Sequence, residues 1–292
     1  MAQNVGTPRF YINILEYLST IGYTDIHDVY RLNPTQLKDS IDTNVTSVSL
    51  PNGIFTTKGY VAYLGHTGGE LAFSNEFSSD IIINAELKES ADSALLPDNT
   101  GFSIRSFDGA DIEDTLNTSS ENPIGCISIG TYYDMPHSPD LSLKLSYEYD
   151  GVKTIQTKGG STLSNASYIK PADWGNAGAW QTDGASNLRS GRRVWDLSFS
   201  YLSDTDLMPN LGVHNYEEDA ILSESEDILT GTDFFSQVIN RTMGHLPFIF
   251  QPDNTNNSND QFAIARLDMK SFSYDQVANN VYNIKLKIRE CW

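Results

Sequence analysis

The chain has 292 residues, a formal net charge of −19 and a hydrophobic fraction of 39%. That apolar content argues against global disorder, and no apolar run is long enough to span a membrane. The chain has 19 Lys and Arg but 38 Asp and Glu. Because the basic residues are scattered along the sequence, a basic groove that binds nucleic acid is not expected. Acidity instead suits solubility in salty water, or a conduit that DNA passes without sticking.

The N-terminal part of the chain predicts a short helix. Residues 7–22 suit one because Thr7 can cap it, Pro8 fits its first turn and Gly22 can end it. Its apolar face has helical spacing and consists of Tyr11, Ile14, Leu15 and Leu18. The first residues lack the basic-then-apolar order of a secretory signal, so we expect synthesis in a cytoplasm and solubility there.

From residue 45 onward, alternating polar and apolar residues predict strands. The expected strands cover 45–50, 58–66, 70–77, 80–87 and 124–133, whereas the polar residues 88–122 are expected to be surface loops. Another run predicts a half-buried antiparallel strand with five inward side chains, Leu141, Leu143, Leu145, Tyr147 and Tyr149. Asp150-Gly151 then favours a hairpin turn.

Residues 156–193 are rich in Gly, Ser and Asn and are expected to connect two domains. After them, residues 194–203 predict a strand that turns four aromatic or aliphatic side chains inward, Trp195, Leu197, Phe199 and Tyr201. An acidic loop follows, because residues 204–233 hold nine acids and no Lys or Arg. A helix over 232–243, capped by Thr232, precedes strands expected at 246–253, 261–268 and 281–292.

The expected fold is therefore mainly β. Residues 1–45 are assigned to an N-terminal helical arm, residues 46–185 to a jelly-roll β-sandwich, and residues 186–292 to a second β-sandwich or open barrel that carries one packed α-helix. The length suits two such β-rich domains.

Motifs of known reaction chemistry are missing from the sequence. It contains no nucleophile elbow, phosphate loop, dinucleotide fingerprint or zinc-protease helix motif. The two cysteines, Cys126 and Cys291, have no CxxC neighbour, and Cys126 lies in an apolar strand pattern that favours a buried, inert thiol. No two histidines lie three or four residues apart, as the pairs in metal-binding helices do. The five histidines are His27, His66, His137, His214 and His245. We therefore expect no enzyme activity, no metal and no cofactor.

Acidic clusters leave weaker alternatives open. Paired carboxylates could act as the acid and base of a glycoside hydrolase, and the candidate pairs are Asp134 with Asp140 and Glu148 with Asp150. A calcium site could use four acids, Asp108, Asp111, Glu113 and Asp114, although their spacing departs from the EF-hand pattern. The sequence Asp-Thr-Asp at 204–206 is similar to a metal-binding motif of some sugar transferases, but the chain shows no sign of the nucleotide-binding fold that such a motif requires. Solvated loops are favoured for all three groups.

Exposed aromatic rings could stack on sugar near the lip of a jelly roll. The four candidates for carbohydrate stacking are Tyr132, Tyr133, Trp174 and Trp180. Packing in a core or an interface explains each of them equally well.

Several stretches resemble known families. "GRRVWDLSFSYLSDTDLMP", "FFSQVINRTMGHLPFIFQPDNTNNSNDQFAIARLD" and "VYNIKLKIRECW" resemble the C-terminal part of virion structural proteins from marine tailed bacteriophages. The order of their strands and helix is similar to the tail-tube fold of tube, distal-tail and baseplate proteins. "KGYVAYLGHTGGELAF" and "GTYYDMPHSPDLSLKLSYEYDG" look like the galactose-binding-like jelly roll of phage tail and adsorption proteins.

The resemblance implies a structural component of a virion, assembled in the host cytoplasm. Its partners would be other copies of itself in a ring and neighbouring tail or capsid proteins, with no sequence-specific nucleic-acid contact and no membrane insertion. The acidic loop at 204–233 would line such a ring or contact a neighbour. The alternatives are a carbohydrate-binding adhesion module that contacts host surface glycan, and a capsid decoration or head-fibre protein on the same particle.

Overall fold

The computed structural model describes residues 5–23, 25–26, 28–32, 45–51, 54, 58–66, 70–74, 81–84, 88–89, 101–107, 115–120, 126–148, 154–164, 192–208, 231–258 and 261–291. Within these residues the fold is mainly β, as the alternating sequence predicts, and it has the character of a β-sandwich with few helices. None of the described helices is long and apolar enough to cross a membrane.

The strands are β1 (Arg9–Asn13), β2 (Val45–Ser49), β3 (Gly59–His66), β4 (Glu70–Ser74), β5 (Ile81–Asn84), β6 (Lys88–Glu89), β7 (Gly101–Phe107), β8 (Thr115–Ser120), β9 (Cys126–Asp134), β10 (Lys144–Glu148), β11 (Thr154–Gln156), β12 (Thr162–Ser164), β13 (Arg192–Ser203), β14 (Phe248–Gln251), β15 (Ala263–Leu267), β16 (Tyr274–Ala278) and β17 (Val281–Glu290). The helical elements are α1 (Ile14–Thr20), the 3-10 turn η1 (Asp28–Tyr30), α2 (Asp204–Leu207) and the π-helix η3 (Phe235–Asn240).

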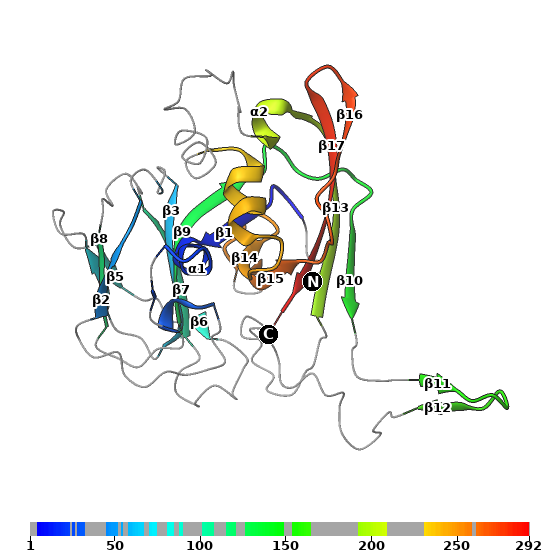
Figure 1. Ribbon diagram of the computed structural model, residues 1–292, viewed down its shortest axis with the longest axis horizontal. Helices are drawn as coiled ribbons and strands as arrows, with labels where there is room; N and C mark the ends of the chain where they lie inside the picture. The colour runs from blue at the N-terminus through cyan, green and yellow to red at the C-terminus, as the bar shows by residue number, and fades with distance from the viewer. Residues whose placement is uncertain are drawn as a thin grey trace.

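One large antiparallel sheet organises the molecule (Figure 1). Its strand order is β10-β13-β17-β15-β14-β1-β9-β3-β7-β6, and β16 pairs with β17 beside that path. A second sheet has the order β2-β8-β4-β5 and lies next to the β3 and β7 end of the large sheet. The strands β11 and β12 form a separate two-stranded sheet that projects away from both.

Strand β1 corrects the helix expected at residues 7–22. Residues 9–13 pair with β9 on one side and with β14 on the other, and the helix begins only at Ile14. The reason is tertiary: Phe10 and Tyr11 are both buried, in different apolar clusters, and only a central strand buries successive side chains on two faces. Asn13, rather than Thr7, caps α1 by accepting a hydrogen bond from the Glu16 amide.

Strand pairing also crosses the boundaries expected at residues 45/46 and 185/186. β1 lies between β9 and β14, and β10 pairs with β13 over five residues. The first and last parts of the chain therefore share one sheet with the middle part. The assignment of its parts to jelly-roll and tail-tube families remains a prediction.

Apolar side chains fill both faces of the large sheet. On one face, α1 and Val48 of β2 pack against Val61 of β3 and Ile129 of β9, which joins the two sheets as in a sandwich. Further along, Trp195 and Phe199 of β13 pack with the helix that contains η3. The other face of the centre carries a third cluster around Tyr11, where the Tyr11 and Tyr60 rings are 5.0 Å apart.

The helix predicted at 232–243 is present but has a different form. Residues 234–242 are helical, and the middle of this segment is the π-helix η3. Asp233, not Thr232, provides the cap, because its carboxylate accepts hydrogen bonds from the Ser236 amide and hydroxyl at 2.9 and 2.8 Å.

Three further expectations are wrong in detail. Residues 101–107 and 115–120, expected as loops, are the strands β7 and β8, because β3 and β4 offer them partners. Residues 154–156 pair with β12 and not with the 141–149 strand, whose pairing partner is β13. That strand begins at Lys144 and leaves Leu141 fully exposed in the preceding turn.

Strand β13 keeps the predicted alternation up to Phe199 and then breaks it. The register against β17 shifts between Phe199 and Leu202, so Leu202 is buried in place of Tyr201. Tyr201 adopts a left-handed φ of 63° and is 80% exposed. A bulge of this kind inserts an extra residue and turns the next side chain to the other face.

Candidate functional site

The proposed sugar-stacking residues do not come together in the described part of the structure. Tyr133 of β9 is buried against Phe234, with ring centroids 5.6 Å apart, and its hydroxyl donates to the Asp206 carbonyl at 3.1 Å. Burial raises the pKa of Tyr133 above its ordinary value. This ring is a core residue and offers no face to a sugar, which corrects the sequence-based assignment. Trp174 and Trp180 lie outside the described residues.

Tyr132, the neighbour of Tyr133 on β9, points to the opposite face and is half-buried. The Arg9 guanidinium lies 4.3 Å from the centre of its ring. A cation at this distance is attracted by the electron-rich ring face. One face of the Tyr132 ring is therefore occupied by a side chain of β1.

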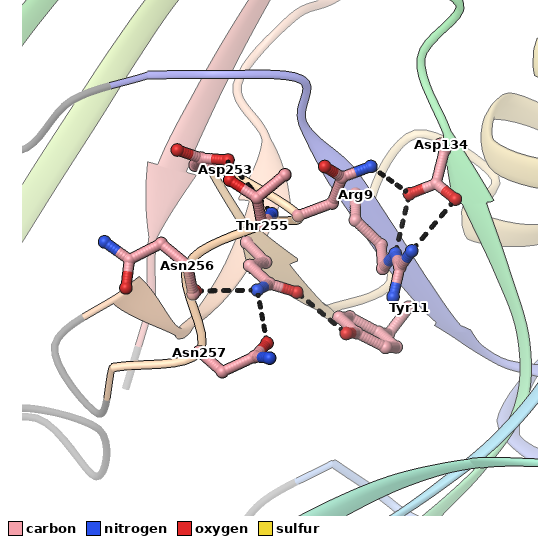
Figure 2. Close-up of polar contacts among 9 residues, drawn as sticks. Arg9, Tyr11, Asp134, Asp253, Thr255, Asn256 and Asn257 are labelled. Carbon is pink, nitrogen blue, oxygen red and sulfur yellow. Dashed lines mark hydrogen bonds and ion pairs between the residues drawn. The ribbon is translucent and has the colours of Figure 1, made fainter.

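A polar cluster surrounds Arg9 where β1, β9 and β14 meet (Figure 2). Arg9 donates two hydrogen bonds to Asp134, at 2.6 and 3.1 Å, and Asn254 donates a third at 3.1 Å. Burial by itself would lower the pKa of Arg9, but the hydrogen bonds to Asp134 help to raise it above its ordinary value. The Asp134 carboxylate thus acts as a partner for Arg9, a structural role.

A second chain of hydrogen bonds fastens the loop after β14 to β1. The Tyr11 hydroxyl donates to Gln251 Oε1 at 2.8 Å, and Gln251 Nε2 donates to the Asn256 carbonyl at 2.8 Å and to Asn257 Oδ1 at 3.2 Å. Gln251 is fully buried, so these bonds replace the water that its amide would otherwise lose. The loop also holds Thr255 through Asp253 Oδ1 at 2.7 Å.

The other carboxylates proposed for catalysis or metal binding also have structural partners where they are described. Asp140 accepts a hydrogen bond from the Ser200 hydroxyl at 2.7 Å, and Glu148 forms an ion pair with Arg289 at 2.6 Å. Asp206 completes a capping box with Ser203 at the start of α2. Asp150 and the four acids proposed for calcium, Asp108, Asp111, Glu113 and Asp114, lie outside the described residues.

Among the described cysteines and histidines, no group of three potential metal ligands occurs. Cys126 is buried, as predicted from its strand pattern, and Cys291 is half-buried with a pKa that burial raises to about 11. His137 Nδ1 lies 2.7 Å from the Ser138 carbonyl, and His245 Nδ1 lies 3.1 Å from the Met243 carbonyl. His27, His214 and the side chain of His66 are outside the described residues.

One buried polar network could not be predicted from sequence patterns. Arg241, the residue that directly follows η3, is fully buried, donates to Thr131 of β9 and donates to the Ile54 carbonyl at 3.3 Å. Thr131 in turn donates to Gln237 at 2.8 Å. Burial lowers the pKa of Arg241 to about 10. This network fastens the helix to the sheet. A regular helical wheel does not predict that Arg241 faces inward, because the π-helix shifts the helical register.

An exposed strand edge is the feature that these internal contacts leave unexplained. All five residues of β16 are exposed, and among the described strands β16 pairs only with β17. Tyr274 anchors β16 by packing edge-on against Tyr282, with ring centroids 5.6 Å apart, while Val277 is 49% exposed. Figure 1 shows β16 and β17 extending beyond β15 as a hairpin. An edge with unpaired amides and carbonyls is a template for a strand from another chain.

No protein-family model, curated protein or solved structure matches the chain.

Proposed function

We propose that this chain is a structural subunit of a bacteriophage virion, of the tail or baseplate type. It acts by joining copies of itself into a ring and by contacting neighbouring virion proteins, after assembly in the host cytoplasm. The resemblance of the C-terminal sequence to virion structural proteins supports the particle, and the exposed edge of β16 supports the mode of action.

The edge of β16 is the observation that carries the proposal. A neighbouring subunit could add a strand to it, with main-chain hydrogen bonds that supply affinity and side-chain contacts that supply specificity. The aromatic pair Tyr274 and Tyr282 ties β16 to the core at Ile284, so the strand is held in position before a neighbour arrives. A pre-ordered edge loses less conformational entropy on association than a mobile one.

The acidity of the chain is consistent with a ring that surrounds DNA. A negative lining repels the phosphate backbone and lets it slide, whereas a basic lining would hold it. Residues 204–233 are the most acidic stretch, and their first part forms the capped turn α2 directly after β13. In the proposed ring this stretch faces the conduit or a neighbouring subunit.

The test combines native mass spectrometry with negative-stain imaging of the purified chain. We expect rings or tubes for the wild type. Val277→Lys places a charge on the exposed edge without touching the core and should shift the protein toward monomer. Ile21→Lys, at a similarly exposed apolar residue at the end of α1, is the matched control and should assemble normally.

Circular dichroism of both variants would confirm that the sheet remains folded. A wild-type chain that stays monomeric at high concentration and is absent from imaged virions would refute the proposed function. Normal rings in the Val277→Lys variant would refute the role of β16 in particular.

A further inference from the structure

We propose that the hairpin formed by β11 and β12 is an arm that docks on a second copy of this chain. This inference goes beyond assembly through β16, because it requires contact between two copies and not a ring. It rests on the isolation of the hairpin, on the one apolar pair that it exposes and on its charge.

The hairpin closes on itself. Thr154–Gln156 pairs with Thr162–Ser164, and the turn is held by hydrogen bonds between Thr157 and Ser161 and from the Gly160 amide to the Thr157 carbonyl. Among the described strands, β11 and β12 pair with each other and with nothing else. Figure 1 shows them projecting from the body of the molecule. A two-stranded hairpin alone is at best marginally stable in water, so a further packing surface is expected to cover it.

The two apolar residues of the hairpin lie on the same face. Ile155 of β11 is directly opposite Leu163 of β12, and their exposed fractions are 66% and 59%. The neighbouring pair, Gln156 and Thr162, points to the other face because side chains alternate along a strand. One side of the arm is therefore apolar and the other polar, as expected of a surface that packs against a partner on one side.

Charge indicates which partner this is. The described hairpin, residues 154–164, carries one lysine, Lys158 in its turn, and no acid, and Lys153 and Lys170 flank it in the sequence, whereas the chain as a whole carries −19. A basic arm on an acidic protein is complementary to the surface of another copy of the same protein. Such complementarity steers association and selects partners more than it sets affinity, which the Ile155 and Leu163 side chains would supply.

The test uses the full-length chain with a photo-crosslinking residue in place of Ser161, at the exposed turn of the arm. Equal amounts of light- and heavy-isotope protein are mixed and irradiated, so that peptides joined across two copies carry mixed labels. We expect mixed-label crosslinks whose yield falls as salt is raised, because salt screens exposed charges.

Two double variants separate the two faces of the arm. Ile155→Ser with Leu163→Ser should weaken the contact by about 30-fold or more, because the exposed parts of two aliphatic side chains would no longer be buried against the second copy. Gln156→Ser with Thr162→Ser changes the opposite face of the same hairpin and should leave the crosslinks unchanged. Lys158→Glu should weaken the contact and reduce its dependence on salt.

Crosslinks confined to single chains, or mixed-label crosslinks that survive the Ile155 and Leu163 substitutions, would overturn the arm proposal. Crosslinks made solely to a different protein in irradiated virions would overturn it as well. Its failure is distinct from that of the proposed function: rings that depend on Val277 but not on the arm refute the arm alone, and arm crosslinks in a protein that forms no rings refute ring assembly alone.

Discussion

Gly130 of β9 lies against the backbone of β1, and replacing it with alanine should strongly destabilise the fold. A Cβ at this position would lie 1.8 Å from the Ile12 carbonyl oxygen and 2.8 Å from the Ile14 amide nitrogen. Real Cβ atoms essentially never come closer than 3.0 Å to such an atom, so the carbonyl must retreat by at least the difference, about 1.2 Å.

A displacement of that size cannot be absorbed by a side chain, because both crowded atoms belong to the backbone. It would strain the five residue pairs that join β1 to β9, and it would move Asn13, which caps α1 and donates to the Tyr30 carbonyl at 2.6 Å. Backbone hydrogen bonds contribute about 1 kcal/mol each, and overpacking costs about 1–3 kcal/mol. We therefore expect Gly130→Ala to lower the free energy of unfolding by about 3 kcal/mol or more.

Urea unfolding followed by circular dichroism measures this loss. Gly159→Ala is the matched control, because its Cβ would meet only the Thr157 hydroxyl at 3.9 Å, an ordinary contact, and it should stay within about 0.5 kcal/mol of the wild type. A Gly130→Ala variant within about 1 kcal/mol of the wild type, with an unchanged urea dependence, would refute the close approach of β1 and β9.

Three further predictions concern buried and half-buried charges and thiols. Glu290 and Arg193 form a buried ion pair at 2.9 Å, so Glu290→Ala should lower the free energy of unfolding by about 3–5 kcal/mol. Asp268→Ala, which breaks the exposed pair with Lys287, should lower it by about 1 kcal/mol or less. Equal losses for the two variants in urea unfolding would contradict this. Burial raises the pKa of Glu16 above 4.5, so its ionisation opposes folding as the pH rises from 4 to 7, and Glu16→Gln should gain stability relative to the wild type over that range; a constant difference in urea titrations at several pH values would count against this. The Cys291 thiol, with a pKa of about 11, should react slowly with a thiol reagent at pH 8 and about tenfold faster per pH unit up to pH 10, and fast labelling of the native protein at pH 8 would show that it is not buried as described.

Local patterns in the sequence determined most of the strands. Trp195, Leu197 and Phe199 alternate with polar residues and are buried, as predicted, and the strand predicted at 281–292 shows the same alternation through its buried residues Ile284, Leu286 and Ile288. These predictions succeed because a strand with one buried face leaves a period of two in its sequence, whatever its partners are. Cys126 was placed correctly in a buried strand for the same reason.

Patterns of function were less informative. Of the four candidate stacking residues, Tyr133 belongs to the core and Tyr132 holds Arg9, and neither outcome is visible in the identity of the residue. The exposed edge of β16 was also missed, although the adjacent asparagines before Val281 mark a turn, and Asn280 adopts a left-handed φ of 57°. Whether a strand is an edge depends on its neighbours.

The sequence by itself determined that the chain is mainly β, that Trp195, Leu197 and Phe199 of β13 face inward, and that the protein is strongly acidic. Only the tertiary structure decided that residues 9–13 form a central strand, that Arg241 turns inward at the end of a π-helix, and that β16 and the β11–β12 hairpin remain exposed. The physical reason is that periodicity records which side of a segment avoids water, whereas pairing between distant strands depends on backbone hydrogen bonds, which every residue except proline can supply on both sides.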